Sequence, residues 1–347
     1  MGLIADIQYA PIPDGHSYAG IPRYYRHSLE TARTAFAQFQ AEGLPLVANL
    51  GDSVDGKVQD LEAHGGEPLP PGIDPGHEAL DHVVEALSVY DQGTILHAYG
   101  NHCLYACDRP HLQKNLGIPF VQEPCGELVG YYSHVHGGVR FIVVDSYDVA
   151  KMKRCSETSR KHRQAVEILQ RENPNYSENE NSPAGLEHLQ RRFVAFNGAV
   201  GPIQLEWLRN ELTQAQQSNE KVIILSHQPI LPESTSTTCL MWNYHEVLDV
   251  LREFSTVVVA SFSGHAHKGG YSRDDESGIH FRVFEASLEN PDPHKTYAMV
   301  DFYEDRVVIR GFGNCESAEY DMSHLVDGDV KWKERCNQEA VPLETRQ

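Results

Sequence analysis

Residues 256–267 read TVVVASFSGHAH, an apolar, β-branched run that ends in a glycine and two histidines. A short, continuously apolar run of this kind predicts a strand that is buried on both faces of a sheet. In α/β sheets, ligands bind just beyond the carboxyl ends of such strands. The stretch therefore predicts an α/β core, with His265 and His267 at the edge of the sheet where ligands gather.

Four other apolar runs repeat this arrangement of a strand followed by a polar side chain. The runs are residues 2–7, 46–50, 94–98 and 221–225, and their ends carry Asp6 with Gln8, Asp52, Asn101 and His227. Each of these side chains alone has an ordinary alternative, such as a turn cap, a left-handed turn residue or a satisfied half-buried histidine. Five strand ends that all finish in metal-competent side chains favour a metal site instead.

Helical patterns alternate with these strands, and each carries apolar residues along one face. They cover residues 27–40, 77–90, 203–212 and 244–254, while further strands are predicted at 139–144, 279–284, 297–302 and 306–312. The last three runs predict a meander, with Glu304-Asp305 as a hairpin turn. The alternation indicates an α/β sheet covered by helices on both sides. We expect a single domain over residues 1–347, with inserted loops at about 57–76 and 151–201.

The charge balance limits the partners of this chain. It has 29 Lys and Arg against 49 Asp and Glu in 347 residues, a formal net charge of −20. Such a surface repels nucleic acid and anionic membrane, so a nuclease acting on a polymer is disfavoured. No apolar run reaches the roughly 20 residues that span a bilayer. An anionic substrate would need a local reversal of the field, which bound divalent metal ions provide.

The cysteines indicate the redox compartment. There are seven, at positions 103, 107, 125, 155, 239, 315 and 336, an odd number without a repeated short spacing. We therefore expect no disulfide framework and a reducing, cytoplasmic location. No secretory signal pattern precedes the first strand, and the early start of that strand leaves open a longer natural chain. A monomer is the expected state.

The motifs at the strand ends, taken in order, resemble those of the calcineurin-like metallophosphoesterase superfamily. They are Asp6-x-Gln8, Gly51-Asp52, Gly100-Asn101-His102-Cys103, His227 and Gly264-His265-Ala266-His267. The resemblance covers nearly the whole chain and implies a four-layer α/β/β/α sandwich of two mixed sheets flanked by helices. Gln8 stands where the superfamily usually has a histidine, and Cys103 stands where it usually has an acid.

The resemblance also implies a pair of divalent metal ions. The first would take Asp6, Gln8, Asp52 and His267, and the second would take Asp52, Asn101, His227 and His265. The metals would polarise the phosphoryl oxygens and generate a bridging hydroxide that attacks phosphorus in line. His102 would be the catalytic residue that stabilises the transition state or protonates the leaving oxygen. Because the amide of Gln8 makes the first site oxygen-rich, Mn²⁺ is expected, with Mg²⁺, Zn²⁺ or iron as alternatives.

Further segments resemble one branch of the superfamily, the manganese-dependent ADP-ribose/CDP-alcohol diphosphatases. They are residues 6–9, 24–28, 145–148, 181–183, 196–198 and 242–244. This resemblance implies hydrolysis of the pyrophosphate of small nucleotide conjugates into two monophosphates. A base needs stacking aromatics and a second phosphate needs donors, so Tyr18, Trp242 and Tyr244 are candidates for the first and Arg23, Arg26 and Asn197 for the second. Leu186 and Asn197 are candidates for a pocket wall formed by the insert at 151–201, and Cys239 is a candidate because it lies in the loop between His227 and Trp242. The alternative is that these aromatics pack in the core and Cys239 is a plain loop cysteine.

Two other functions use the same motifs. A phosphomonoesterase or phosphoprotein phosphatase would hold the same metals in a wide site without a base pocket. A non-catalytic scaffold on the same fold would usually have lost metal ligands, whereas every ligand position here keeps a donor atom. Activity with added Mn²⁺ distinguishes a scaffold from an enzyme, and the products distinguish the enzymes.

Overall fold

The computed structural model describes residues 1–124, 126–152, 159–291 and 296–325, and two six-stranded sheets form its centre. The first sheet has the order β18-β17-β16-β1-β4-β5, formed by Ala318–Asp321, Arg306–Gly313, Thr296–Phe302, Gly2–Ile4, Leu46–Asn49 and Thr94–His97. The second has the order β14-β15-β13-β12-β9-β8, formed by Gly270–Arg273, His280–Val283, Val258–Ser263, Lys221–Ser226, Val139–Val144 and Tyr132–His136. Both sheets are mixed, because β1 is parallel to β4 but antiparallel to β16, and β9 is parallel to β12 but antiparallel to β8.

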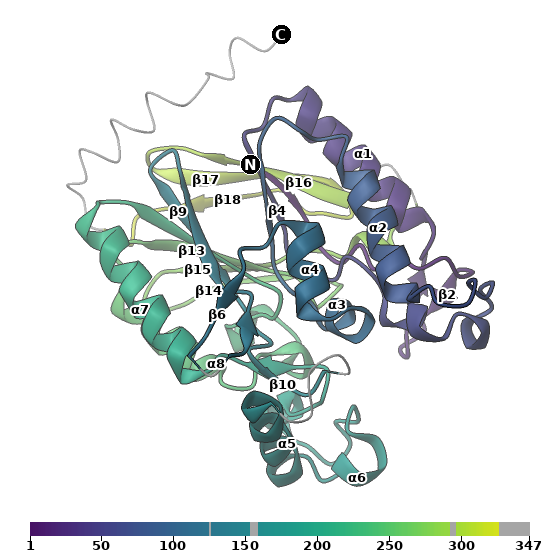
Figure 1. The fold of residues 1–347 in the computed structure, drawn as a ribbon. Helices are drawn as coiled ribbons and strands as arrows, with labels where there is room; N and C mark the ends of the chain where they lie inside the picture. Colours follow the sequence, from purple (N-terminus) through teal and green to yellow (C-terminus); the bar gives the residue numbers. More distant parts are fainter. Residues whose placement is uncertain (125, 153–158, 292–295, 326–347) are drawn as a thin grey trace.

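Helices cover the outer face of each sheet. In Figure 1, α1 (His27–Ala41) and α2 (Pro75–Leu87) lie on one side of the sheets, and α7 (Pro202–Gln217) and α8 (Tyr244–Glu253) lie on the other. Residue alternation along the strands fills the layers: Leu46 and Ala48 join the core between the sheets, whereas Val47 joins the cluster beneath α1 and α2. The same alternation in the second sheet fills a third cluster beneath α7 and α8. The predicted four-layer α/β/β/α sandwich is confirmed.

Local sequence explains where these helices begin. Asp74 caps α2, since its Oδ1 accepts hydrogen bonds from the backbone N–H groups of Gly76 and His77, and Pro75 occupies the first turn. Pro202 likewise occupies the first turn of α7, although its N-cap residue, Gly201, has no side chain to accept a hydrogen bond. The longest predicted helices and strands therefore lie within a few residues of their expected positions.

One part of the predicted meander is wrong. Strand β15 pairs in parallel with β13 of the second sheet, whereas β16 and β17 form a hairpin in the first sheet. The hairpin turn itself is confirmed at Glu304-Asp305, where the Tyr303 N–H donates to the carbonyl of Arg306. A run of apolar residues specifies a strand but not its partner, and the chain crosses between the sheets after residue 284.

The segment 151–201, expected as an inserted loop, contains regular structure. It includes α5 (Arg160–Glu172), the short helix α6 (Tyr176–Asn179), the 3-10 turn η3 (His188–Arg192) and β11 (Gly198–Ala199), which pairs with β10 (Val149–Ala150). Figure 1 shows α5 and α6 at one end of the molecule, outside the four layers. The segment 57–76 likewise holds the short 3-10 turns η1 (Gly56–Asp60) and η2 (Glu62–His64).

The remaining elements are short. They are β2 (Gly15–His16), β3 (Pro22–Arg23), α3 (Asn101–Ala106), α4 (Arg109–Leu116), β6 (Val121–Gln122), β7 (Leu128–Val129), η4 (Pro232–Ser234), η5 (Thr237–Cys239) and η6 (Ser287–Glu289). Among the described residues, Cys103, Cys107, Cys239 and Cys315 form no disulfide, and Cys125, Cys155 and Cys336 lie outside those residues. The described helices include none with the length and hydropathy of a bilayer span.

Candidate metal centre

The predicted ligands converge where the carboxyl ends of the parallel strands meet. Strands β1, β4 and β5 run in parallel, as do β9, β12 and β13, so their polar end residues reach one edge of the sandwich. One donor atom each from Asp52, His227 and His265 lies within 4.8 Å of the others. The backbone N–H of His265 donates to Asp6 Oδ2 at 3.0 Å, which joins the ends of the two sheets.

The backbone at these residues adopts an unusual conformation. Asp6, Gln8, Asp52 and His265 have φ values of 50°, 43°, 53° and 67°, in the left-handed region that glycine normally occupies. Hydrogen bonds between adjacent strand ends hold this geometry, from the Asp6 N–H to the Gly51 carbonyl and from the Gln8 N–H to the Asp52 carbonyl. Strained residues of this kind concentrate at functional sites, where the surrounding fold holds them.

The motif glycines allow the ligands to approach the backbone closely. A Cβ on Gly100 would lie 2.0 Å from Asp52 Oδ1, and one on Gly264 would lie 2.5 Å from Asp6 Oδ2. Neither position can therefore carry a side chain while both carboxylates keep their places. This close approach explains why glycine stands at the start of the motifs Gly100-Asn101-His102 and Gly264-His265-Ala266-His267.

Asp52 is oriented by the first turn of α3. Its Oδ1 accepts from the backbone N–H groups of His102 at 2.8 Å and Cys103 at 3.4 Å. The second oxygen, Oδ2, faces the other strand ends and lies 3.2 Å from His227 Nε2. Cys103, at the position usually held by an acid, accepts a hydrogen bond from the Ser53 N–H through its Sγ. Contacts at both oxygens therefore fix the orientation of the Asp52 carboxylate, which is predicted to bridge the two metal ions.

Each histidine of the cluster donates outward and can present an unprotonated nitrogen inward. Nδ1 of His227 lies 2.8 Å from the Leu50 carbonyl, Nε2 of His265 lies 2.8 Å from Asn197 Oδ1, and Nδ1 of His267 lies 2.7 Å from Glu289 Oε1. An acceptor on the outer nitrogen fixes the tautomer and directs the lone pair of the other nitrogen, as in known metal sites. The histidines therefore suit cation binding.

Buried polar atoms at the centre also call for a cation. His227 Nε2 and Gln8 Oε1 are buried and have no hydrogen-bond partner among the described residues. Two acceptors 3.2 Å apart, His227 Nε2 and Asp52 Oδ2, repel each other unless a proton or metal ion lies between them. The donor set combines two carboxylates, two amides and three imidazoles, which fits divalent manganese.

The Gln8 amide lies between the two halves of this centre. Its Nε2 is 2.8 Å from His267 Nε2 and 3.2 Å from Asp52 Oδ2. A half-turn of the amide exchanges its two atoms and directs Oε1 toward the same groups, the orientation that a cation favours. The buried Asn101 accepts a hydrogen bond from the Tyr147 hydroxyl at its amide oxygen, at 3.2 Å.

The charges of the carboxylates and imidazoles are strongly coupled. Burial alone would raise the pKa of Asp52, but His227 and His102 outweigh it and hold that pKa well below its usual range. Burial would lower the pKa of His267, but hydrogen bonds to Asp6 and Glu289 raise it to about 9. Burial would raise the pKa of Asp6 as well, but His267 and His227 lower it, so Asp6 and Asp52 are both ionised at neutral pH and supply negative charge for a cation.

His102 sits beside the cluster on α3 and contacts a second acid. Its Nδ1 accepts from the Gly56 N–H at 3.0 Å and lies 3.3 Å from Asp55 Oδ2. Burial would lower the pKa of His102, but the carboxylates of Asp55 and Asp52 raise it above the usual range. The backbone N–H suits a neutral ring and the carboxylate suits a charged ring, so both protonation states have a partner at Nδ1.

The predicted pocket residues are dispersed by the structure. Tyr18 is fully exposed on the β2–β3 hairpin, Arg26 is exposed, and Leu186 and Tyr244 are half-buried. Cys239 is half-buried, and burial together with the Asp6 charge raises the pKa of its thiol to about 12.

Two of these residues differ from the expectation. Trp242 is 2% exposed and packs with Leu169 and Phe193, so its ring has no open face for a base. Asn197 is fully buried and all its polar side-chain atoms are bonded within the protein, so it has no donor left for a phosphate. The aromatic composition of a segment does not reveal which ring faces solvent, and neither burial was visible in the sequence.

Sequence reasoning missed three residues of this centre. Asp55 contacts His102, Glu289 contacts His267, and Tyr147 contacts Asn101. Asp55 carried a usable signal, because it lies three residues after Asp52 in the same strand-end turn. Tyr147 lies in the segment 145–148, which resembles the diphosphatase branch but was given no role at the metal centre. Glu289 carried no signal, since it follows no strand that ends in a predicted ligand.

Comparisons with known proteins agree with this geometry. No protein-family model matches the chain. The manganese-dependent ADP-ribose/CDP-alcohol diphosphatase of Arabidopsis thaliana is 36% identical over 325 residues, which cover 92% of this chain and 96% of that protein. The Homo sapiens protein of the same name is 32% identical and covers 90% and 89%.

A solved structure supports the same assignment. The crystal structure of a dimetal phosphatase from Danio rerio matches with a TM-score of 0.81 and 34% identity, over 93% of this chain and 98% of that one. The relatives are therefore similar along their full length, in sequence and in fold. On this evidence, the chain belongs to the manganese-dependent ADP-ribose/CDP-alcohol diphosphatase family.

Proposed function

We propose that this protein hydrolyses the pyrophosphate bond of small nucleotide conjugates, with ADP-ribose and CDP-alcohols as the substrate class, into two monophosphates. Relatives named for these substrates are similar over about nine-tenths of the chain. The observation that carries the proposal is the cluster of Asp52, His227 and His265 at the strand ends, whose donor atoms lie within 4.8 Å.

Two divalent manganese ions would be held by seven side chains. The first ion would take Asp6, Gln8, Asp52 and His267, and the second would take Asp52, Asn101, His227 and His265. When bound, the ions neutralise charge on the phosphoryl oxygens and lower the pKa of a water molecule that acts as nucleophile. The protein orients these ligands through the outward contacts of its histidines and through the α3 turn.

His102 is the proposed acid that serves the leaving phosphate. Its ring is 24% exposed, and Nδ1 is engaged by Gly56 and Asp55, which leaves Nε2 for the substrate. Asp55 stabilises the charged ring, so His102 can carry a proton at neutral pH and donate it to the leaving oxygen. After donation from Nε2 the remaining proton stays on Nδ1, where the Asp55 carboxylate accepts it, so the imidazole stays in place through the reaction.

Arg23 is the proposed contact for the second phosphate. It lies in β3 at the base of the hairpin that carries Tyr18, and its positive charge acts on the pKa of both His102 and His267. Its Nε is buried without a hydrogen-bond partner among the described residues and is 3.8 Å from Glu289. Arg26 is exposed and points to a less direct role, such as contact with the outer part of a conjugate.

The proposal also includes a single domain and a monomeric, cytoplasmic enzyme. The four described cysteines without disulfides support a reducing compartment. Size-exclusion chromatography with light scattering measures the oligomeric state.

The test of the activity is a substrate panel with purified protein and Mn²⁺. ADP-ribose and CDP-choline are compared with AMP and p-nitrophenyl phosphate, and the products are identified by ³¹P NMR. We expect AMP with ribose 5-phosphate, and CMP with phosphocholine, and little release of inorganic phosphate. Inorganic phosphate from the monoesters without diphosphate cleavage would instead assign a phosphomonoesterase. No turnover with metal bound would assign a scaffold.

A further inference from the structure

The segment between α5 and β11 reaches the metal centre through the side chains of Asn197 and Phe196. Asn197, in the turn just before β11, is fully buried, and its Oδ1 lies 2.8 Å from Nε2 of the proposed ligand His265. The neighbouring Phe196 ring packs 5.8 Å from the His265 ring. A segment that stands outside the four layers therefore contacts one half of the centre directly.

The orientation of the Asn197 amide is fixed by its other bonds. Its Nδ2 donates to the carbonyls of Arg192 at 2.9 Å and Thr238 at 2.7 Å, which uses both N–H groups. The reverse orientation would place the amide oxygen against two carbonyl oxygens. Oδ1 must therefore face His265, and as an acceptor it requires a proton on His265 Nε2. The unprotonated Nδ1 is then the atom left for a cation.

The turn that carries Asn197 is itself attached to the second sheet. The Gly198 N–H donates to Gln228 Oε1, and the Gly198 carbonyl accepts from the Trp242 N–H. Gln228 directly follows the proposed ligand His227 in the chain. The buried Arg192 side chain donates to the Trp242 carbonyl and completes the frame. Asn197 is thus held by a rigid set of contacts, and its position does not depend on its own side chain alone.

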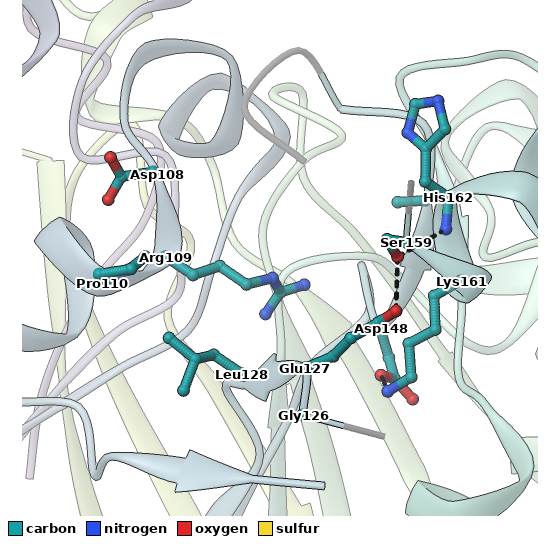
Figure 2. Close-up of a pocket in the computed structure, with 11 residues that line it drawn as sticks. Asp108, Arg109, Pro110, Gly126, Glu127, Leu128, Asp148, Ser159, Lys161 and His162 are labelled. Carbon is teal, nitrogen blue, oxygen red and sulfur yellow. Dashed lines mark hydrogen bonds and ion pairs between the residues drawn. The ribbon is translucent and has the colours of Figure 1, made fainter. Parts of the chain in front are cut away.

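Helix α5, which precedes this segment in the chain, is held in place by ion pairs and a hydrogen bond. Lys161 forms an ion pair with Asp148, and the Ser159 hydroxyl donates a hydrogen bond to Glu127 (Figure 2). Lys161 also forms an ion pair with Glu123. Beside these contacts lies a cavity of about 270 Å³ between α4 and α5, lined by Arg109, Leu128 and His162 among others. The contact between α4 and α5 is therefore not closely packed. The ion pairs of Lys161 and the hydrogen bond of Ser159 contribute to the attachment of α5 and of the segment that follows it.

We propose that Asn197 is a positioning residue that sets the tautomer and direction of His265, so that affinity for the second metal ion depends on the attached segment. The inference rests on the proposed function for its metal ions but makes no claim about the substrate. It replaces the substrate contact expected for Asn197 from the sequence with a role behind the ligand. Outer partners of metal-bound histidines commonly change metal affinity about 10–100-fold when removed.

Two substitutions of similar size separate the acceptor from the packing. Asn197→Leu fills the space without an acceptor, whereas Asn197→Asp keeps an acceptor for His265 Nε2, and both lose the two donors. Mn²⁺ binding is titrated by electron paramagnetic resonance, which distinguishes a coupled pair of ions from a single ion. We expect Asn197→Leu to bind the second ion about 10–100-fold more weakly. Asn197→Asp should retain the paired signal.

The control is a second buried asparagine of the same segment. Asn173 is 2% exposed and donates to the carbonyls of Glu180 and Ser182, but it does not contact a proposed ligand. Asn173→Ala should lower the melting temperature without weakening the second ion. Equal Mn²⁺ affinities in Asn197→Leu and wild type would overturn the inference, as would equal losses in the leucine and aspartate variants. Failure of the proposed function is a separate result, in which wild type binds two ions but cleaves no diphosphate.

Discussion

The two halves of the metal centre are backed by different kinds of groups. His227 and His265, proposed for the second ion, donate to a backbone carbonyl and an amide oxygen that are uncharged and buried. His267, proposed for the first ion, donates to the carboxylate of Glu289, whose side chain is 16% exposed and lies beside Arg23. The histidines of the second half are thus oriented by neutral, buried acceptors, whereas the histidine of the first half is oriented by a partly exposed charged group.

This difference predicts different metal behaviour in the two halves. Neutral buried acceptors orient a ligand without adding charge, so the second half has its geometry before a metal arrives. In the first half, the Gln8 amide must turn and the Glu289 charge is shared with Arg23. We therefore expect the second ion to bind more tightly, and the first ion to exchange with added metal.

The largest effect is expected where the halves meet. Asp52→Ala removes the proposed bridging carboxylate, so both ions should be lost. Each ion contributes several kcal/mol to transition-state stabilisation, and each 1.36 kcal/mol is tenfold in rate, so kcat should fall by more than about 10⁴-fold. Metal content by elemental analysis and kcat with Mn²⁺ are the measurements. The exposed Asp60→Ala is the control, and one tightly held ion in Asp52→Ala would contradict a bridging role.

A large effect on rate without an effect on either ion is expected at His102. His102→Ala should keep both ions and lower kcat by roughly 10²–10⁴-fold, the range for lost acid or electrostatic help. Asp55→Asn should give a smaller loss, since the ring stays but its charged form loses a partner. Loss of metal from His102→Ala would show that this residue belongs to one of the halves rather than to the substrate side.

A smaller and one-sided effect is expected at Glu289. Glu289→Gln keeps an acceptor but removes the charge, so the first ion should bind about 10-fold to 100-fold more weakly while the second is unchanged. Titration with Mn²⁺, followed by paramagnetic resonance, separates the two binding steps. Glu276→Gln, an exposed glutamate paired with Arg252, serves as the control. If both ions weaken equally, the halves are not independent and the comparison fails.

The smallest effect is expected at Gln8, and it concerns metal choice more than rate. An imidazole is a softer and stronger donor than an amide oxygen, so Gln8→His should tighten the first site and shift its preference toward Zn²⁺. Activity is measured against Mn²⁺ and Zn²⁺ concentration for both proteins. Superimposable curves would show that position 8 does not determine the metal preference.

The layers of the fold were predictable because burial on both faces leaves a clear mark in the sequence. Strands β4 and β12 are mostly apolar and are buried at every position, and the helix predicted at 77–90 is observed at Pro75–Leu87. The sheet joined by β15 was not predictable, since strand pairing depends on where the chain returns in space. The regular structure of α5 was hidden for another reason: only Ala165 and Leu169 of that helix are buried, so its apolar face is narrow.

The proposed ligands could be named from the sequence, whereas the groups behind them could not. Every proposed ligand lies within four residues of the end of a strand, and the sequence shows this spacing. Asn197, Glu289 and Tyr147 come from three distant turns, and only the folded chain brings them to the centre. Trp242 and Asn197 were assigned to the substrate pocket because their residue types can stack on a base and donate hydrogen bonds. Their burial depends on the fold and could not be predicted from the residue type.

The left-handed backbone at Asp6, Gln8, Asp52 and His265 has a consequence for engineering this protein. Each such conformation costs roughly 1–3 kcal/mol, so a thermostability search would select these four positions first and would offer glycine at each of them. The substitution would relax the chain and delete a donor atom in the same step. A gain in thermal stability at these positions would therefore be accompanied by a loss of activity. Substitutions that widen the apolar face of α5, or that fill the cavity between α4 and α5, are better choices for stabilising the protein.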